Sequence, residues 1–248
     1  MPDKEHYTLV HAPIVEAILD IGVLLPENTD INVLDSIKEF DDYILDGHHF
    51  RGSGMFEYKS DEQKIISNAS DPIIMGYRYK RKSQNTSFQF RRDGFNFNML
   101  KPYTRWDDFK QQAQEKWNKY KEYFKPDKIT RVALRFINKI PFGERFEPSD
   151  YFLTVPRLSP SLEKYDMNNL FCQITINNKD INAFSNITQG IEVLGKDKSN
   201  FIFDIDVFSL YNGEIDEDKL WSEFDNLRQF KNEIFFESVT EDTLDKFK

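Results

Sequence analysis

Two stretches with mirrored charge decide the fold: Arg131-Val-Ala-Leu-Arg-Phe-Ile-Asn138 and Phe201-Ile-Phe-Asp-Ile-Asp-Val-Phe208. Because side chains alternate between the two sides of a strand, Arg131 and Arg135 share one side of the first stretch. The two aspartates of the second stretch share one side in the same way. Charges flanked by apolar residues need partners, so we expect the two strands to meet or to line a common polar interior.

The composition limits the class of protein. The chain has 248 residues, of which 39% are hydrophobic and 15% aromatic, including 23 Phe. This is enough apolar material for one large core or two fused half-domains, and it excludes a disordered chain. The net charge of -9 argues against nucleic acid as the main partner. Nucleic-acid affinity rests on Lys and Arg side chains that neutralise phosphates.

The cysteine content and the apolar runs indicate the compartment. A single cysteine, Cys172, excludes an internal disulfide and fits a reducing compartment. The longest apolar stretch, residues 14–25, is interrupted by Glu16 and Asp20. We therefore expect no signal peptide, no membrane span and a cytoplasmic location.

The first half of the chain reads as a strand, a helix and a meander. Residues 14–25 predict a strand, and apolar spacing over residues 30–43 predicts a helix. Four β-rich runs follow, separated by turn residues: 55–59, 64–68, 73–82 and 87–100. Asp93-Gly94 is the strongest hairpin signal among them. A two-residue turn at that dipeptide would place Phe90 opposite Phe97 and give the meander one aromatic side.

A long amphipathic helix is predicted between Thr104, as its capping residue, and Pro126. Apolar residues recur along it at spacings of three and four: Trp106, Phe109, Ala113, Trp117, Tyr120 and Phe124. This periodicity favours a core position for these residues over ligand stacking. A strand over residues 129–140 follows the helix.

The rest of the chain repeats a meander that leads into a helix. Strands are predicted over 171–177, 183–194 and 201–210, and a helix over 216–236 with Leu220, Phe224 and Leu227 as its apolar stripe. We therefore predict an α+β protein of two related antiparallel sheet units, each with packed amphipathic helices, pseudo-duplicated and closely fused. The units would be residues 1–140 and 161–248, joined by a linker at 141–160.

Five segments resemble those of a sporadically distributed bacterial family of uncharacterised proteins of about this length. They are Ala12-Pro-Ile-Val-Glu-Ala17, Leu100-Lys-Pro-Tyr-Thr-Arg-Trp106, Arg131-Val-Ala-Leu-Arg-Phe-Ile-Asn138, Phe203-Asp-Ile-Asp206 and Phe236-Glu-Ser-Val-Thr-Glu-Asp242. The resemblance spans nearly the whole chain. It implies no activity, cofactor or catalytic residue. The patchy distribution of the family implies horizontal transfer and an accessory role linked to mobile elements or defence.

An acidic cluster is the first candidate site. Glu16 could join Asp204 and Asp206 at a divalent metal or at an acid/base site, which needs convergent carboxylates. The competing structural interpretation is favoured, because arginines are available at matching strand positions. In it the carboxylates are neutralised by Arg131 and Arg135, and Asn138 completes a buried hydrogen-bond network.

A basic strand is the second candidate site. Arg78, Lys80 and Lys82 share one side of a predicted strand, and Arg91 and Arg92 belong to a nearby hairpin. Single-stranded RNA readers interleave aromatic and basic residues on a sheet in this manner. The favoured alternative is a solvated outer face, because an antiparallel sheet needs a polar side.

Other motifs carry little chemistry. The adjacent His48 and His49 diverge in an extended segment and make a poor zinc motif. Cys172, flanked by Phe171 and Ile174, is better explained as a small buried residue than as a nucleophile. Gly52-Ser-Gly54 is too short for a phosphate loop. We expect no cofactor and no metal.

We therefore favour a non-enzymatic accessory or regulatory protein that binds a protein partner, in a mobile-element or toxin-neutralising context. The alternatives are a hydrolase or small-ligand and metal-binding protein that uses the acidic cluster between the halves, and a single-stranded RNA-binding protein. Long sheets and many aromatic residues also favour a homodimer.

Overall fold

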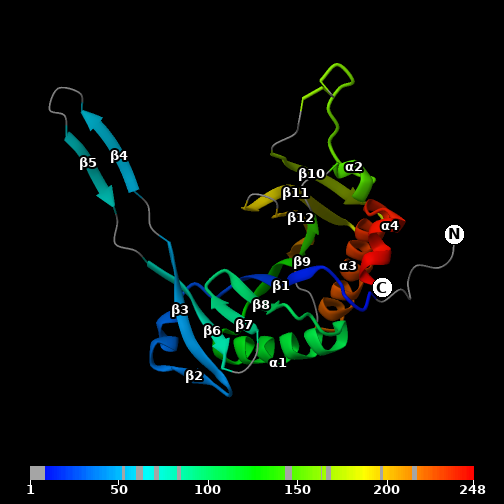
Figure 1. Ribbon diagram of the computed structural model, residues 1–248. Helices are drawn as coiled ribbons and strands as arrows, with labels where there is room; N and C mark the ends of the chain where they lie inside the picture. The colour runs from blue at the N-terminus through cyan, green and yellow to red at the C-terminus, as the bar shows by residue number, and fades with distance from the viewer. Residues whose placement is uncertain are drawn as a thin grey trace.

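The computed structural model describes residues 9–51, 54–59, 64–69, 73–82, 85–142, 147–162, 164–165, 169–195, 198–213 and 217–248. Its main feature is one antiparallel sheet with helices packed against it (Figure 1). The strands of this sheet are β1 (Ile14–Leu24), β2 (Glu39–Phe40), β3 (Tyr43–Arg51), β6 (Ile73–Arg81), β7 (Thr86–Arg91), β8 (Gly94–Leu100), β9 (Lys128–Phe142), β10 (Phe171–Asn178), β11 (Ala183–Gly195) and β12 (Lys198–Gly213). The α+β class predicted from the sequence is confirmed.

The remaining elements lie around this sheet. The helices are η2 (Ile31–Ser36), α1 (Trp106–Phe124), α2 (Pro148–Tyr151), α3 (Glu217–Ser238), α4 (Glu241–Leu244) and η3 (Asp245–Phe247). β4 (Gly54–Lys59) and β5 (Lys64–Ala69) form a separate two-stranded sheet that extends away from the rest (Figure 1). No helix in the described part of the chain is long and apolar enough to cross a membrane.

The strand order is β10-β11-β12-β9-β1-β8-β7-β6-β3-β2. The two charged stretches therefore meet as expected, because β9 pairs with β12 and places Asp206 opposite Arg135. β9 also pairs with β1 on its other edge. Strands from both predicted units thus contribute to one continuous sheet.

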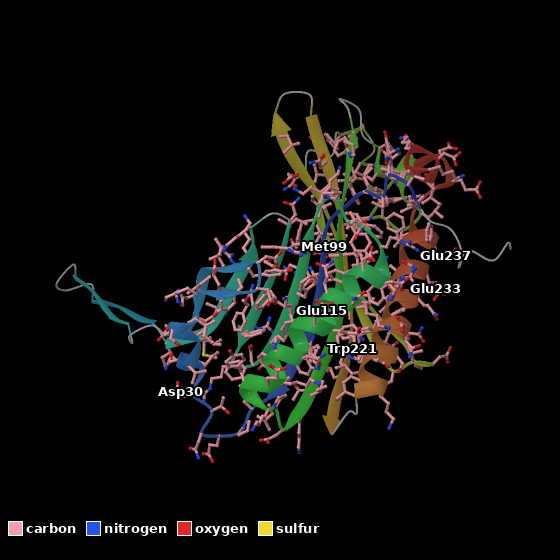
Figure 2. The ribbon with its side chains drawn as sticks, turned by 90° about the horizontal axis from the view of Figure 1, so that it is seen from below. Asp30, Met99, Glu115, Trp221, Glu233 and Glu237 are labelled. Carbon is pink, nitrogen blue, oxygen red and sulfur yellow. The ribbon has the colours of Figure 1, made fainter. Side chains whose placement is uncertain are left out.

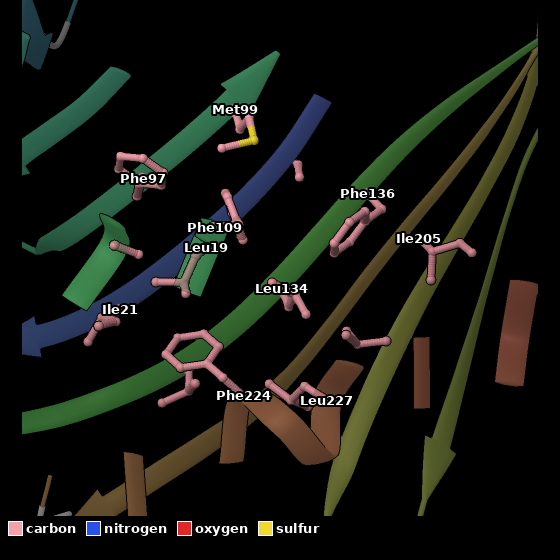
Figure 3. Close-up of a cluster of buried hydrophobic side chains, with 14 of the residues drawn as sticks. Leu19, Ile21, Phe97, Met99, Phe109, Leu134, Phe136, Ile205, Phe224 and Leu227 are labelled. Carbon is pink, nitrogen blue, oxygen red and sulfur yellow. The ribbon is translucent and has the colours of Figure 1, made fainter. Parts of the chain in front are cut away.

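The long helices α1 and α3 lie side by side on one side of the sheet (Figure 2). A bond from the Trp106 indole nitrogen in α1 to Oδ1 of Asp225 in α3, 2.9 Å long, joins the two helices. We call this the helix side of the sheet. The side chains beneath the helices form a continuous core, which includes Leu19, Phe97, Phe109, Leu134, Phe136, Ile205, Phe224 and Leu227 (Figure 3).

The predicted core positions of both helices are confirmed. All six apolar residues expected along α1 are buried, as are Leu220, Phe224 and Leu227 of α3. The expected cap is wrong, because Arg105 occupies the N-cap without a side-chain bond. Thr104 instead donates to the sulfur of Met99 at 3.8 Å.

The helix expected over residues 30–43 is mostly wrong. Only a short 3-10 helix, η2, forms, and Ile37 after it is extended. The carbonyl of Ile37 accepts a bond from the Tyr79 hydroxyl at 3.1 Å, which fixes the chain against β6. Asp41 then turns the chain with a φ of 53°, so Tyr43 begins β3. Pairing in the sheet thus overrides the local apolar spacing.

The register expected for the β7–β8 hairpin is also wrong. Arg92 and Asp93 form the turn, so Phe90 lies opposite Phe95 and Phe88 opposite Phe97. Gly94 belongs to β8, and a Cβ on it would lie 2.2 Å from the carbonyl oxygen of Ile21. The glycine is therefore required by the close approach of β8 to β1 and by its own φ of 156°, and it is not one of the two turn residues. The aromatic side of the meander is confirmed, since these four Phe residues are all buried.

Candidate functional site

The second side of the sheet carries the predicted charged residues, and we call it the charged side. Strand alternation places Arg131, Arg135, Asp204 and Asp206 there, opposite to the core residues of β9 and β12. Nε of Arg135 donates to Oδ1 and Oδ2 of Asp204 at 2.9 and 3.1 Å, and Nη2 donates to Oδ2 at 2.5 Å. Arg131 reaches Asp206 through Nη2 at 3.3 and 3.2 Å. Both aspartates are therefore paired across the β9–β12 seam.

Asp20 extends these pairs to the other strands and was missed as a partner. Its Oδ1 accepts from Arg131 at 3.3 Å, and its Oδ2 accepts from Arg91 at 2.8 Å. The carboxylate thus links β7, β1 and β9. Its position on the same side of the strand as Glu16 is the sequence signal that could have found it.

The electrostatic environments of the two β12 aspartates differ. Burial raises the pKa of Asp206 above its usual range, and the nearby Arg131 and Arg135 only partly oppose this. The hydrogen bonds to Asp204 raise the pKa of the Arg135 guanidinium. Arg131 also lies over the Phe208 ring, with its guanidinium carbon 4.8 Å from the ring centroid.

Glu16 acts on the charge of Arg135 together with the two aspartates, but it has a hydrogen-bond partner of its own. Its Oε1 accepts a bond from the Asn98 side-chain amide at 2.7 Å. Each candidate carboxylate is therefore engaged by a nitrogen donor. In the described ranges, no group of three His, Cys, Asp or Glu side chains could hold a metal ion. This geometry fits the structural interpretation of the cluster better than a metal site.

The expected place of Asn138 in the charged network is wrong. Asn138 is buried, and its amide donates to the carbonyl oxygen of Phe203 at 2.9 Å. It lies an odd number of residues from Arg131 and Arg135 on an extended strand, which places it on the helix side. Its role is to donate a hydrogen bond to a backbone carbonyl of β12 within the core.

Two asparagines of β8 leave buried polar atoms without partners on the charged side. The Oδ1 atoms of Asn96 and Asn98 are buried and make no hydrogen bond with the described residues. Asn96 lies opposite Asp20, and Asn98 lies opposite Ile18. Unsatisfied buried acceptors are rare in folded proteins. The charged side thus has two acceptors for which the described chain supplies no donor.

The predicted basic face is largely neutralised by acidic neighbours. Arg78 pairs with Asp46 at 2.8 Å, and Lys82 pairs with Glu39. Arg91 is engaged by Asp20, as described above. The phosphates of a bound nucleic acid would have to displace these carboxylates from the basic side chains.

The remaining sequence candidates occupy structural positions. His48 packs edge-on against Tyr77, with ring centroids 5.0 Å apart. The Cys172 thiol lies 3.5 Å from Oε1 of Gln189, and burial raises its pKa, which opposes thiolate formation. A cavity of 590 Å³ lies between the first turns of α1 and the ends of β7 and β8, lined in part by Thr86, Asp108 and Glu115. None of the predicted site residues lines it.

The strand predicted over residues 171–177 is confirmed as β10, but its exposed outer edge is a feature that the sequence interpretation missed. β10 is the terminal strand of the sheet, and no strand among the described residues pairs with its outer edge (Figure 1). Six of its eight residues are exposed. Its sequence, Phe-Cys-Gln-Ile-Thr-Ile-Asn-Asn, has no charged residue, proline or glycine. The lack of charge and the β-branched residues were visible in the sequence, but the terminal position was not.

A scan against models of known protein families finds none that matches this chain, and a search of curated proteins also finds no match. The resemblance to a sporadically distributed bacterial family therefore stays a prediction.

Proposed function

We propose that this protein is a non-enzymatic partner-binding protein, and that the outer edge of β10 is where another polypeptide docks. The observation that carries the proposal is an exposed terminal strand whose outer edge pairs with no other strand in the described ranges. A terminal strand presents a row of unpaired backbone N–H and C=O groups, to which an extended chain can add.

The contrast between the two ends of the sheet supports this proposal. At the other end, β2 has only two residues, and its Glu39 forms an ion pair with Lys82. Short length and charge are the usual means by which proteins block an edge. β10 has eight residues and no charged side chain. An edge left in this state favours pairing with another chain over exposure to water.

The side chains of β10 also favour docking. Phe171 is 77% exposed, and Ile174 and Ile176 are each 38% exposed. Val193 and Leu194 of the neighbouring strand β11 are exposed as well. Apolar side chains that alternate along an accessible edge provide specificity pockets in strand addition, while the backbone provides affinity.

The non-enzymatic part of the proposal rests on the charged side of the sheet. Asp204 and Asp206 are each bonded to an arginine, and Glu16 is bonded to an asparagine. A general acid or base must instead be able to exchange a proton with a substrate. The mobile-element or toxin-neutralising context is a further proposal, and it rests on the resemblance alone.

We also propose that the chain arose by internal duplication. The order β1, β8, β7, β6 on one side of the central β1–β9 pair mirrors the order β9, β12, β11, β10 on the other. In each half, a three-strand meander leads into a long helix, α1 or α3. Under this proposal the boundary between the repeats would lie just before β9.

The docking proposal can be tested by capture from a lysate of the native host. The tagged wild-type protein is compared with an Ile174→Lys/Ile176→Lys variant and with Leu210→Lys as the control. Leu210 is also an exposed apolar residue, but β12 is an internal strand. We expect the wild type and the control to retain the same polypeptide and the edge variant to lose it. Equal retention by all three proteins would refute β10 as the docking edge.

A further inference from the structure

We infer that the polypeptide on the β10 edge is a second copy of this chain, with the two β10 strands paired antiparallel about a two-fold axis at Thr175. This inference rests on the proposed docking role of β10 and names its partner. The paired edges would join two ten-stranded sheets into one.

The register follows from the geometry of antiparallel pairs. Residues directly opposite each other lie on the same side of a sheet. A two-fold axis perpendicular to the sheet therefore passes midway between one residue and its own copy, and we name the axis by that residue. With Thr175 on the axis, Ile174 lies opposite Ile176 of the second copy, and Ile176 lies opposite Ile174. With Ile174 on the axis, Ile176 would instead lie opposite Cys172.

The Thr175 register groups side chains of the same character. Ile174 pairs with Ile187, a buried core residue, so Ile174 and Ile176 lie on the helix side. The dimer would bring four isoleucines together there and cover apolar area that is otherwise exposed. On the charged side, Gln173 would lie opposite Asn177 of the second copy, which matches amide with amide.

Charge favours a second copy over an acidic or basic partner. The chain carries a net charge of -9, but β10 has no charged residue. The next two residues, Lys179 and Asp180, contribute one charge of each sign. Two copies can therefore approach along this edge without like charges facing each other, and a strongly charged partner strand would find no complement there.

Symmetry gives a further reason for a second copy. A strand paired with its own copy about a two-fold axis uses the same edge on both molecules, so the assembly closes at two chains. Both exposed β10 edges are then covered. The opposite ends of the joined sheet are the short, charged β2 strands, which do not support further growth.

The test uses a charge exchange specific to this register. Ile174→Lys/Ile176→Lys would place lysine opposite lysine, and Ile174→Glu/Ile176→Glu would place glutamate opposite glutamate. We expect the wild type to be a dimer by light scattering during size-exclusion chromatography, and each double variant to be a monomer. An equimolar mixture of the two variants should form a heterodimer, because lysines then face glutamates. Circular dichroism of each variant checks that it is folded.

A cross-link checks the axis residue itself. In a Cys172→Ser background, Thr175→Cys places the new thiol opposite its own copy, within the Cα separation that disulfides require. We expect mild oxidation to yield a covalent dimer. The matched Asn177→Cys variant should not cross-link, because residue 177 faces residue 173 of the second copy.

The outcomes separate this inference from the docking proposal. A wild type that stays monomeric at about 100 µM overturns the inference, as does a dimer that the charged variants leave intact. If the wild type is monomeric and the edge variants lose a different captured protein, the docking role stands and the second copy does not. If the edge variants change neither the oligomeric state nor the capture, both proposals fail.

Discussion

Arg135 and Asp204 form a bidentate pair across the β9–β12 seam, with three nitrogen-to-oxygen distances of 2.5 to 3.1 Å. The side chain of Asp204 is only 10% exposed, whereas the side chain of Arg135 is 45% exposed. The pair is therefore shielded from water on its acidic half.

Replacing Asp204 should destabilise the protein. Asp204→Asn keeps the shape of the side chain but removes the charge that accepts these bonds. Charge-assisted bonds contribute more than neutral ones, and partial solvent screening of Arg135 reduces the loss. We expect the free energy of unfolding to fall by about 1–2 kcal/mol in urea titrations at pH 7. An unchanged unfolding midpoint would mean that the pair contributes nothing to stability.

Asp206 should behave in the opposite way, although it lies only two residues away. Its pKa in the folded protein is raised above the ordinary value, mainly by burial. The folded state therefore binds more protons than the unfolded state between the two pKa values, and stability falls as the pH rises through this window. Asp206→Asn, which resembles the protonated form, should lose no stability at pH 7. The unfolding free energy of Asp206→Asn relative to wild type should rise from pH 4 to pH 7. A fall over this range would contradict a raised pKa of Asp206.

The contrast between these residues shows what the sequence could predict. Strand alternation predicts that the two arginines share one side and that the two aspartates share one side, and their opposite charges predict that the two strands meet or line a common polar interior. Both predictions rest on period and charge, which are local properties. The differing burial of Asp204 and Asp206 depends on neighbours from other strands. The link from Arg91 through Asp20 to Arg131 requires the order β7-β8-β1-β9, which no local pattern encodes.

The errors at Gly94 and β10 have the same cause. Asp93-Gly94 matched a turn signal, but the glycine is needed where β8 approaches the backbone of β1. The sequence predicts a strand over residues 171–177. Whether that strand is internal or terminal is decided by the topology of the whole sheet, and so its exposed edge could not be predicted from its own residues.

Gly94 should tolerate no side chain. The Cβ of a Gly94→Ala variant would lie 2.2 Å from the Ile21 carbonyl oxygen, which belongs to a central strand and cannot move without disrupting the sheet. We expect a loss of about 3 kcal/mol or more, seen as a lower melting temperature or a lower soluble yield. Gly190→Ala is the matched control, because its nearest atom would be at 3.4 Å. Equal effects of the two substitutions would contradict the steric argument.

Asp225 should couple the two long helices. Its two oxygens accept bonds from Trp106 and Lys110 of α1, at 2.9 and 2.6 Å. Asp225→Ala removes both and leaves the Trp106 indole N–H, on a buried side chain, without its acceptor. We expect a loss of about 1–2 kcal/mol in the free energy of unfolding. The side chain of Asp127 is exposed and makes no such bond with the described residues, so Asp127→Ala should change stability by less than about 0.5 kcal/mol, measured in the same titration.

Lys231 of α3 provides the clearest pH dependence. Its ammonium lies 4.2 Å from the centroid of the Phe136 ring, and no carboxylate pairs with it among the described residues. Burial lowers its pKa from 10.5 to about 7, and the nearby Arg228 adds to this effect. The buried charge therefore opposes folding at and below neutral pH.

The sign of the pH dependence follows from the protons bound in each state. Below pH 7 the folded and unfolded states both hold the proton, so stability does not change with pH through this group. Between about pH 7 and 10.5 the folded amine is neutral while the unfolded chain is still protonated, so stability rises with pH. Lys231→Met should remove this rise and be more stable than wild type at pH 6.5 by a few kcal/mol. Urea unfolding at pH 6.5, 8 and 9 tests this, with Lys128→Met as an exposed control. The stability of the wild type relative to Lys231→Met could instead stay flat or fall over this range. That result would show that Lys231 is paired or solvated in the folded protein.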